Sequence, residues 1–419
     1  MSHPIDASRP SAAPPADVPP IDVLIVGGGP VGGTAAALLA QAGLDVAVIE
    51  AGDPALLSRP DSDGRAISVA LSGQRVLAGA GIWDRLAHMA QPILDIRVTD
   101  GDAPVFLHYD HAALGDDPFG WIVENEAIKA AVFARLAELS NLRLLAKVRL
   151  AGLDIGPGLA TATLDDGRRV RASLVVAADG RGSPTRAAAG IGITRWDYRQ
   201  HGIVCAIAHE IPHEGVAHEH FLPAGPFAIL PMTGNRSGIV WTERAALAPA
   251  IVAQDDGAFL AELSAKVGGL LGRLSLAGSR FAYPLSLQIA ERIVDRRLAL
   301  IGDAAHGMHP IAGQGMNMGL RDVAALAEAV VDARRYGLDP GAPDVLARYR
   351  RWRRFDTLVM LAVTDGLNRL FSNGIAPVRL ARGLGLAAVE RMPGLKRTLM
   401  RHAMGLAGDL PRLLKGEPL

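Results

Sequence analysis

A glycine-rich segment near the start of the chain has the residue types and spacing of a dinucleotide-binding turn. Gly27, Gly29 and Gly32 form the pattern G-x-G-x-x-G directly after an apolar run, and an Ala/Leu-rich stretch follows. Such glycines permit a tight turn and let a pyrophosphate approach a helix N-terminus, where free N–H groups favour anions. Glu50, which ends the next apolar run, is placed to accept hydrogen bonds from a ribose. A purely structural glycine turn is the alternative.

Two later segments favour a flavin over a nicotinamide as the bound dinucleotide. Gly302 and Asp303 end an apolar run, where a carboxylate could accept a hydrogen bond from the ribityl chain of a flavin. An aspartate that caps the following turn is the alternative. The segment 309–322 then reads HPIAGQGMNMGLRD, and its Gly-Gln-Gly turn precedes a helix whose positive end would stabilise a reduced flavin. The flavin contacts expected here are Pro310, Gly313, Gln314, Gly315, Met316 and Asn317.

The sequence contains no obvious acid–base triad. His309, Pro310 and Gln314 are weak catalytic candidates in the same segment, and His306 lies just ahead of them. Two histidines in a tight turn are as often structural as catalytic. The single cysteine, Cys205, excludes a cysteine-based metal site and a CxxC redox pair, and we expect no metal.

Taken together, these motifs resemble one known family. The run from His309 to Asp322 is similar to the signature of the aromatic-ring hydroxylases of ubiquinone biosynthesis, which are group A flavin monooxygenases related to para-hydroxybenzoate hydroxylase. The run Asp179-Gly180-Arg-Gly-Ser183, with Arg186 beyond it, resembles the family's DG motif. The stretch TDGLNRLFSN at 364–373 is also similar, so the resemblance covers almost the whole chain.

The resemblance implies an FAD-dependent reaction in which a flavin C4a-hydroperoxide transfers one atom of O2 to an electron-rich phenol. The implied substrate is a polyprenylated phenol on the route to ubiquinone, and the implied electron donor is NAD(P)H or a reduced ferredoxin. The resemblance also implies that Asp179 and Gly180 bind FAD, that Arg65 lies near the flavin, and that Pro231 and Trp241 line the substrate pocket. A solvent-facing arginine and plain core packing are the respective alternatives for Arg65 and for the last pair.

Other flavoprotein classes fit less well. A disulfide reductase needs paired cysteines, and a flavin halogenase needs a WxWxIP motif; the sequence has neither. A geranylgeranyl-reductase-like flavoprotein and a catalytically silent FAD-binding partner within a ubiquinone-biosynthesis complex both stay open. Oxygen consumption that depends on substrate would separate them from a hydroxylase.

The segments that position these residues show two kinds of hydrophobic pattern. Apolar runs at 21–26, 45–49, 174–178 and 297–301, with helical patterns at 31–42, 127–139 and 315–335, indicate buried parallel strands and their helices. Short alternating runs between 203 and 241 indicate an antiparallel sheet. We therefore predict an α/β protein: a Rossmann-like FAD-binding domain of the glutathione-reductase type with an inserted β-sheet substrate domain and a helical C-terminal region. The expected segments are a disordered leader at 1–20, FAD-binding residues 21–90, 120–190 and 285–340, substrate-domain residues 91–119 and 191–284, and C-terminal helices at 341–419.

Charge and hydropathy limit the classes of partner that the protein is expected to contact. A formal net charge of zero argues against nucleic acid, and no apolar run reaches the length of a membrane span. The leader lacks the features of a secretory signal, so we expect a cytoplasmic protein. Residues 343–419 contain 14 Lys and Arg against 6 Asp and Glu. This basic region predicts peripheral contact with the inner face of a membrane, through Leu380, Leu384, Leu395, Leu399 and Met404 with the interleaved Arg382, Arg391, Lys396, Arg397 and Arg401. Packing on the FAD-binding domain or a partner subunit is the alternative.

Overall fold

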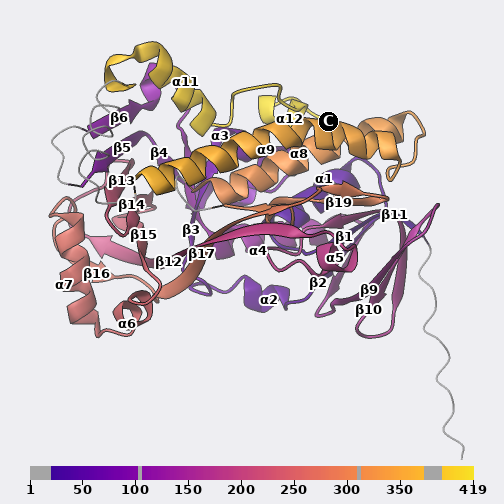
Figure 1. Ribbon diagram of the computed structural model, residues 1–419, viewed down its shortest axis with the longest axis horizontal. Coiled ribbons are helices and arrows are strands. Elements are labelled where there is room, and N and C mark those ends of the chain that lie inside the picture. Colours follow the sequence, from indigo (N-terminus) through magenta and orange to yellow (C-terminus); the bar gives the residue numbers. More distant parts are fainter. Residues whose placement is uncertain (1–19, 102–105, 309–312, 372–388) are drawn as a thin grey trace, which may run out of the picture.

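The computed structural model describes residues 20–101, 106–308, 313–371 and 389–419. Within these residues the chain forms three β-sheets, with helices packed against them (Figure 1). The α/β fold predicted from the sequence is confirmed, with a mixed sheet whose central strands are parallel at one end and a large, mainly antiparallel sheet at the other.

The first sheet, sheet A, contains the predicted βαβ unit. Its main path runs β18-β19-β11-β1-β2-β8, and helix α1 (Pro30–Gln41) connects the neighbouring parallel strands β1 and β2. A hairpin of β9 and β10 continues antiparallel from β11, and β18 closes the other edge. The strands are β1 (Ile21–Val26), β2 (Val46–Glu50), β8 (Leu142–Ala146), β9 (Leu150–Ile155), β10 (Ala160–Leu164), β11 (Arg169–Ala177), β18 (Val294–Asp295) and β19 (Leu298–Leu300).

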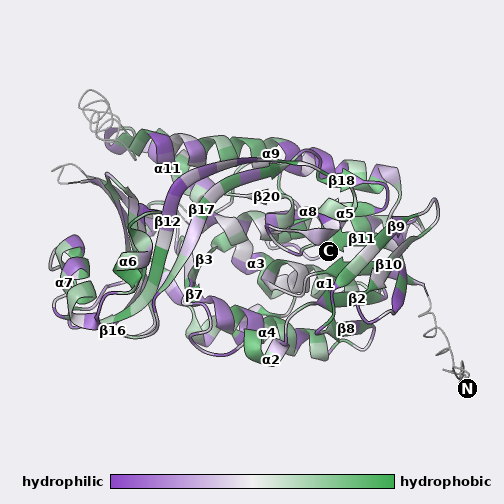
Figure 2. Ribbon diagram, turned by 60° about the horizontal axis from the view of Figure 1, so that its bottom comes forward, coloured by the Kyte–Doolittle hydropathy of each residue, from purple (hydrophilic) through white to green (hydrophobic). Residues whose placement is uncertain are grey.

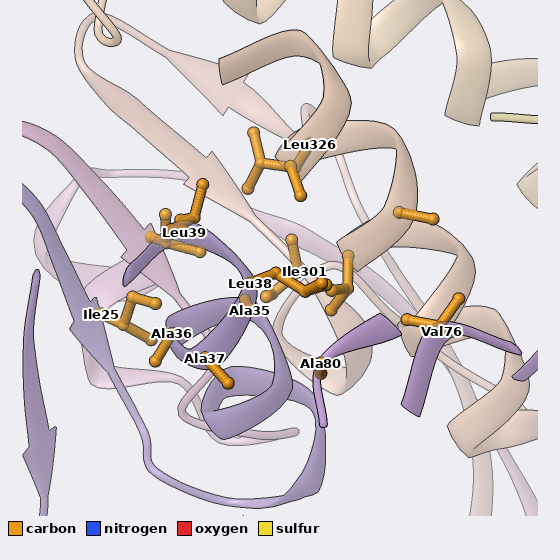
Figure 3. Close-up of a cluster of buried hydrophobic side chains, with 14 of the residues drawn as sticks. Ile25, Ala35, Ala36, Ala37, Leu38, Leu39, Val76, Ala80, Ile301 and Leu326 are labelled. Carbon is orange, nitrogen blue, oxygen red and sulfur yellow. The ribbon is translucent and has the colours of Figure 1, made fainter. Parts of the chain in front are cut away.

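Both faces of sheet A are buried, which explains why its strands read as continuous apolar runs. Val23 and Ile25 face a core shared with α1, α3 (Leu71–Gly79), α4 (Asn125–Ala137) and α8 (Gln314–Arg335). Figure 3 shows part of this core, where Leu38 and Leu39 of α1 lie near Ile301 and Leu326. Leu24 and Val26 point to the other side, toward the β9–β10 hairpin.

The second sheet, sheet C, follows the order β20-β17-β12-β15-β14-β13-β5-β6, with the short β16 beside β12. The expected boundary between residues 284 and 285 falls inside β17, so sheet C continues past it. The strands are β5 (Asp95–Asp100), β6 (Phe106–Asp110), β12 (Ile193–His209), β13 (Val216–Leu222), β14 (Gly225–Met232), β15 (Arg236–Arg244), β16 (Leu274–Leu276), β17 (Phe281–Ala290) and β20 (His306–Gly307).

Sheet C has two faces with different neighbours. Its outer face packs against α6 (Ala248–Val252) and α7 (Asp256–Val267) through Ile203, Phe227 and Ile239. Its inner face is turned toward the rest of the molecule and includes Ala217, Leu230 and Met232, which share a cluster with sheet B. Sheet B consists of β3 (Ala66–Ala70), β4 (Gln91–Ile93) and β7 (Gly120–Glu124), and its side chains join both the core of sheet A and the cluster on the inner face of sheet C.

The C-terminal region is helical, as predicted. Helix α9 (Pro343–Phe371) runs along both halves of the molecule (Figure 2), and Phe371 at its end stacks on Phe221 of β13 with ring centroids 4.0 Å apart. Helix α11 (Pro393–Ala403) packs on sheet C, and α12 (Arg412–Lys415) returns to the core around α1 and α8. Among the described helices none is both long and apolar enough to cross a membrane.

Candidate active site

The glycine-rich turn after β1 provides an uncapped helix N-terminus. Gly27 has a φ of +105°, and a Cβ there would lie 2.4 Å from the carbonyl oxygen of Ala178. A Cβ at Gly32 would lie 2.0 Å from the carbonyl oxygen of Gly27, so only glycine fits at either position. Gly29 is different, because no described atom lies within 4 Å of the place its Cβ would occupy. Helix α1 begins at this open position without a side-chain cap or an acidic residue in its first turn.

Glu50 closes the other side of the same turn. One carboxylate oxygen accepts a hydrogen bond from the Gly28 amide at 2.8 Å, and the other accepts one from the Gly52 amide at 2.7 Å. The carboxylate therefore holds the glycine turn against the end of β2. Each of its oxygens retains a lone pair that could accept from a ligand hydroxyl.

The two aspartate–glycine motifs meet side by side, although 122 residues separate Arg181 from Asp303. Arg186 is buried and donates to the carbonyl oxygens of Ala304 at 2.8 Å and Arg181 at 2.9 Å. The Arg181 guanidinium contacts the Asp303 carboxylate at 3.3 Å. The Gln288 side-chain amide donates to the carbonyl oxygens of both Arg181 and Asp303 at 3.0 Å. The sequence places Arg181 in the DG motif without indicating its role, and sequence reasoning missed Gln288, because nothing in the spacing of Gln288 marks it.

Within the first of these motifs, Asp179 organises its own loop. Its carboxylate accepts hydrogen bonds from the Ser183 hydroxyl and from the Thr185 amide, the latter at 2.9 Å. Gly180 has a φ of +81°, and no described atom lies within 4 Å of its would-be Cβ. Asp303 in the second motif is more available, since its side chain is 44% exposed.

A buried ionic cluster supports the Asp303 loop from behind. The Asp322 carboxylate accepts from the Gly302 amide at 2.8 Å, and it pairs with His306 Nε2 at 2.7 Å and with Arg353 Nε at 2.6 Å. Burial alone would raise the pKa of Asp322, but the charges of His306 and Arg353 hold that pKa below its ordinary value. His306, weighed as a base from the sequence, is thus engaged in this cluster. Arg353 was not foreseen, because it lies on a different helix.

The start of α8 provides a second uncapped helix end. Its N-cap residue, Gly313, has a φ of +61°, and no side chain of the described residues caps the first turn. No described atom lies within 4 Å of the Cβ position of Gly315, and Gln314 and Met316 are half-buried. Asn317 is committed to the protein, because its side-chain nitrogen donates to Ser68 O at 2.9 Å and its oxygen accepts from the Ala70 amide at 2.9 Å. His309 and Pro310 lie outside the described residues.

Arg65 projects between sheet B and sheet C. Its guanidinium lies 5.4 Å from the centroid of the Tyr283 ring and pairs with Asp63 at 3.0 Å. Lys129 also contacts Asp63, at 2.8 Å. Burial would raise the pKa of Asp63, but the hydrogen bonds and charges of Arg65 and Lys129 hold it well below its usual range. The Arg65 side chain remains 45% exposed, so it is accessible to a ligand.

The two residues expected to line the substrate pocket share the outer face of sheet C. Trp241 is fully buried, with its ring 5.9 Å from that of Phe259 on α7 and 4.5 Å from the Lys266 ammonium. Side chains alternate along β14, so Pro231 shares a face of the sheet with Phe227 and Ile229, and this is the outer face. The inner face carries instead Ala228, Leu230 and Val240 and their neighbours.

These features fit FAD. Two uncapped helix N-termini supply amides for a pyrophosphate and for the anionic edge of a reduced flavin, and the glycine at the first has open space where a Cβ would otherwise stand. Asp303 offers an accessible carboxylate between them. Fold and site together define an FAD-dependent oxidoreductase.

Comparison with known proteins gives the same class. Residues 20–354 match the FAD binding domain family. Ubiquinone hydroxylase UbiL of Rhodospirillum rubrum is 56% identical, over 95% of this chain and 93% of that protein. The 3-demethoxyubiquinol 3-hydroxylase of Escherichia coli is 35% identical, over 92% of this chain and 98% of that protein. The mitochondrial ubiquinone biosynthesis monooxygenase COQ6 of Xenopus tropicalis is 33% identical, over 91% and 93%.

Solved structures show the same fold. The p-nitrophenol 4-monooxygenase PnpA of Pseudomonas putida superposes with a TM-score of 0.78 at 20% identity, over 93% of this chain and 98% of that chain. PqsL of Pseudomonas aeruginosa gives 0.73 at 23% identity, over 87% and 99%. The chain belongs to the FAD binding domain family and is an FAD-dependent monooxygenase, an aromatic hydroxylase that uses O2. The family and the cofactor predicted from the sequence are both confirmed.

Proposed function

We propose that this enzyme hydroxylates the ring of a polyprenylated phenol on the route to ubiquinone, with NAD(P)H as the source of electrons. The observation that carries the proposal is the similarity to ubiquinone hydroxylases from bacteria and animals, which extends over more than nine tenths of the chain. The inner face of sheet C is consistent with such a substrate. Its small and aliphatic side chains, Ala217, Ala228, Leu230 and Val240, offer an apolar surface for a prenyl chain.

Each group of residues proposed to hold FAD corresponds to one part of the cofactor. Gly27, Gly29 and Gly32 with the start of α1 would receive the pyrophosphate, and Glu50 the adenosine ribose. Asp303, oriented by Arg181 and supported by Gly302, would accept from the ribityl chain, with Asp179 and Gly180 shaping the adjoining loop. Arg65 would lie beside the flavin ring system. The start of α8 would contact the same rings through Gly313, Gln314, Gly315 and Met316. Asn317 and Pro310 are assigned to this contact from the sequence alone. Bound FAD supplies the activation of O2, and the protein supplies position, dry surroundings and electrostatics.

The test is hydroxylation by the purified holoenzyme. With a short-chain 2-prenylphenol and NAD(P)H, we expect oxygen consumption that depends on the phenol, and a product that carries one atom from labelled O2. NADH, NADPH and a reduced ferredoxin should be compared as donors under anaerobic conditions, since the ferredoxin is the alternative source of electrons. Retention of FAD without oxygen incorporation would identify a silent FAD-binding member of a biosynthetic complex, and reduction of the prenyl chain would identify a reductase. Either result would overturn the proposal.

We also propose that the enzyme makes peripheral contact with anionic lipid through its C-terminal region. On the solvent side of α9, Phe355 is 77% exposed, and Leu358, Val359 and Val363 continue the apolar stripe. Three arginines precede this stripe, Arg350, Arg351 and Arg354, and none forms an ion pair within the described part of the chain. Basic residues beside exposed apolar ones are what an anionic lipid surface attracts.

The residues of the C-terminal region that were expected at the lipid surface differ in their exposure. Leu395 and Leu399 on α11 are exposed beside Lys396, Arg397 and Arg401. Met404, expected at the interface, is instead buried with Met400 in the cluster beneath sheet C, so it belongs to the core. Leu380, Arg382 and Leu384 lie outside the described residues.

Sedimentation with anionic liposomes tests the lipid contact. The double variant Phe355→Glu and Leu358→Glu should lose sedimentation at low salt while retaining FAD, and a charge change at an exposed leucine elsewhere, Leu247→Glu at a 49% exposed position ahead of α6, serves as the control. Wild-type protein that ignores such liposomes would contradict direct lipid contact. That result would favour a protein complex as the carrier of substrate.

A further inference from the structure

Glu219 places a carboxyl group on the inner face of sheet C. Along β13 the side chains alternate, and His220 lies on the outer face with its ring centroid 6.2 Å from that of Phe227. Glu219 therefore points to the inner side, between Ala217 and Phe221. By register it stands opposite Ala228 on β14 and Val98 on β5.

Among the described residues, the surroundings of Glu219 are apolar and include no partner for its charge. Ala217 belongs to a cluster with Met232 and Met400, while Phe221 belongs to a separate cluster with Leu107 and Phe371, so the carboxyl lies where two apolar clusters meet. Within the described residues, Glu219 has no hydrogen bond from a side chain and no ion pair. The residue is half-buried, which leaves part of it accessible to a ligand on this face.

The ionisable groups of the adjoining elements are few. Asp100 and Tyr109 are on β5 and β6, and burial together with the charge of Glu390 raises the pKa of Tyr109 to about 12. Glu390 is itself paired with Lys396 at 2.7 Å, and at the end of α9 Asp365 is paired with Arg369 at 2.8 Å. His218 and His220 project from the opposite face of β13.

Burial is the cause that raises the pKa of Glu219, to about 7. A carboxyl that changes charge near neutral pH can take a proton and release it at the pH where the enzyme works. Natural cores seldom leave an acidic side chain unpaired among apolar ones unless it serves a purpose. The geometry already places this one on the sheet face proposed for the substrate.

We propose that Glu219 binds the phenolic hydroxyl of the substrate and accepts its proton. The phenol O–H bond breaks, an O–H bond forms on the Glu219 carboxylate, and the electron pair stays on the phenolate oxygen. Nothing is oxidised or reduced in this step. The resulting phenolate has a more electron-rich ring, which is the form that accepts an oxygen atom most readily. This inference rests on the proposed function, because it requires a phenol as substrate.

The decisive variant is Glu219→Gln, which keeps the shape of the side chain and removes the proton acceptor. Glu243→Gln is the matched control, since Glu243 is on the outer face of the same sheet. Both holoenzymes are assayed with a short-chain 2-prenylphenol and NAD(P)H between about pH 5.5 and 9. In wild type and in the control, kcat should fall as the pH drops through about 7, because the base becomes protonated. In Glu219→Gln, kcat should be lower by about 100-fold or more and should lose this dependence, while KM changes much less.

Two further measurements separate a catalytic role from a structural one. Glu219→Asp retains a carboxylate and should recover part of kcat together with the pH dependence. Phenol binding to the oxidised holoenzyme, followed by flavin absorbance, should become independent of pH in Glu219→Gln, while FAD affinity stays unchanged. If Glu219→Gln keeps the wild-type kcat and pH profile, the proposal is overturned. If wild type does not hydroxylate the phenol, the proposed function fails first, and binding of the phenol then decides the role of Glu219 separately.

Discussion

The nucleotide-binding sheet and the large sheet C are both apolar, yet the chain encodes their functional sides differently. In sheet A the residues proposed to hold FAD lie in loops that directly follow strands, at Gly29 after β1 and at Asp303 after β19. In sheet C the proposed substrate contacts depend on which of two faces a side chain takes, and Glu219 and Trp241 point in opposite directions. A loop motif marks its own position, whereas a side chain on a strand is assigned only when the covering elements are known.

The reason is the period of two along a strand. Alternation shows which residues share a face of the sheet, but a shift of one residue exchanges the faces. When the residues on both faces are apolar, the sequence does not show which face is covered by helices and which faces the rest of the molecule. Helices α6 and α7 cover the outer face of sheet C with apolar side chains, and the inner face is also apolar where it meets sheet B. Trp241 and Pro231 are therefore consistent with either side from sequence, and the structure puts both beneath the helices.

The largest effect should come from the loop after β1. Gly29→Val would fill the open space at the start of α1 and block the pyrophosphate, and we expect colourless protein with no measurable FAD. Gly158→Val is the matched control, because that glycine also has open space around its Cβ position but lies in the β9–β10 turn. FAD content from the absorbance of the purified proteins gives the answer. A yellow Gly29→Val protein would show that the cofactor does not approach this turn.

The two faces of sheet C should respond differently to truncation. Trp241→Ala removes a fully buried ring from the outer face and should lower the free energy of unfolding by about 3–5 kcal/mol while KM for the phenol stays the same. Leu230→Ala on the half-buried inner face should cost less stability and raise KM severalfold. Urea unfolding and oxygen-consumption kinetics measure the two quantities. If Trp241→Ala raised KM and Leu230→Ala did not, the substrate pocket would have to lie on the outer face of sheet C.

The next effect in size concerns the loop after β19. Asp303→Ala should weaken FAD binding about tenfold, the scale of one hydrogen bond to a charged group, and leave the fold intact. Asp166→Ala is the control, since it removes a comparable aspartate–arginine pair at an exposed turn, where Arg168 is 2.6 Å away. FAD titration followed by protein fluorescence measures the affinity. Unchanged affinity in Asp303→Ala would leave this carboxylate only the role of orienting Arg181.

Sequence reasoning could reach the fold and the loop motifs because both are local signals. The apolar runs predicted β1, β2, β11 and β19 within a few residues, and the glycine turn lies where its spacing indicated. The partners that hold the motifs could not be predicted. Arg353 reaches Asp322 from another helix, and Gln288 spans two loops from a strand of a different sheet. Asn317 matched a cofactor-binding pattern, yet its amide is engaged with the backbone of β3. Such contacts are made by tertiary packing, which no short pattern records.

The smallest expected effect is a dependence of stability on pH that originates at Glu219. Burial raises the folded-state pKa of this carboxyl to about 7, from an ordinary value of 4.5. The folded protein therefore holds the proton more tightly than the unfolded chain, and this stabilisation is complete below about pH 4.5 and lost as the pH rises through 7.

Glu219→Gln cannot ionise, so its unfolding free energy relative to wild type should rise between pH 5 and pH 8. Partial exposure limits the gain to on the order of 1–2 kcal/mol. Urea unfolding of both holoenzymes at the two pH values measures the difference, and effects of pH on FAD binding cancel because both proteins share them. The outer-face variant Glu243→Gln provides the comparison across the sheet. A difference that stays constant with pH would mean that folding does not raise the pKa of the Glu219 carboxyl, which would then lack the property that suits it to exchange a proton with a phenol.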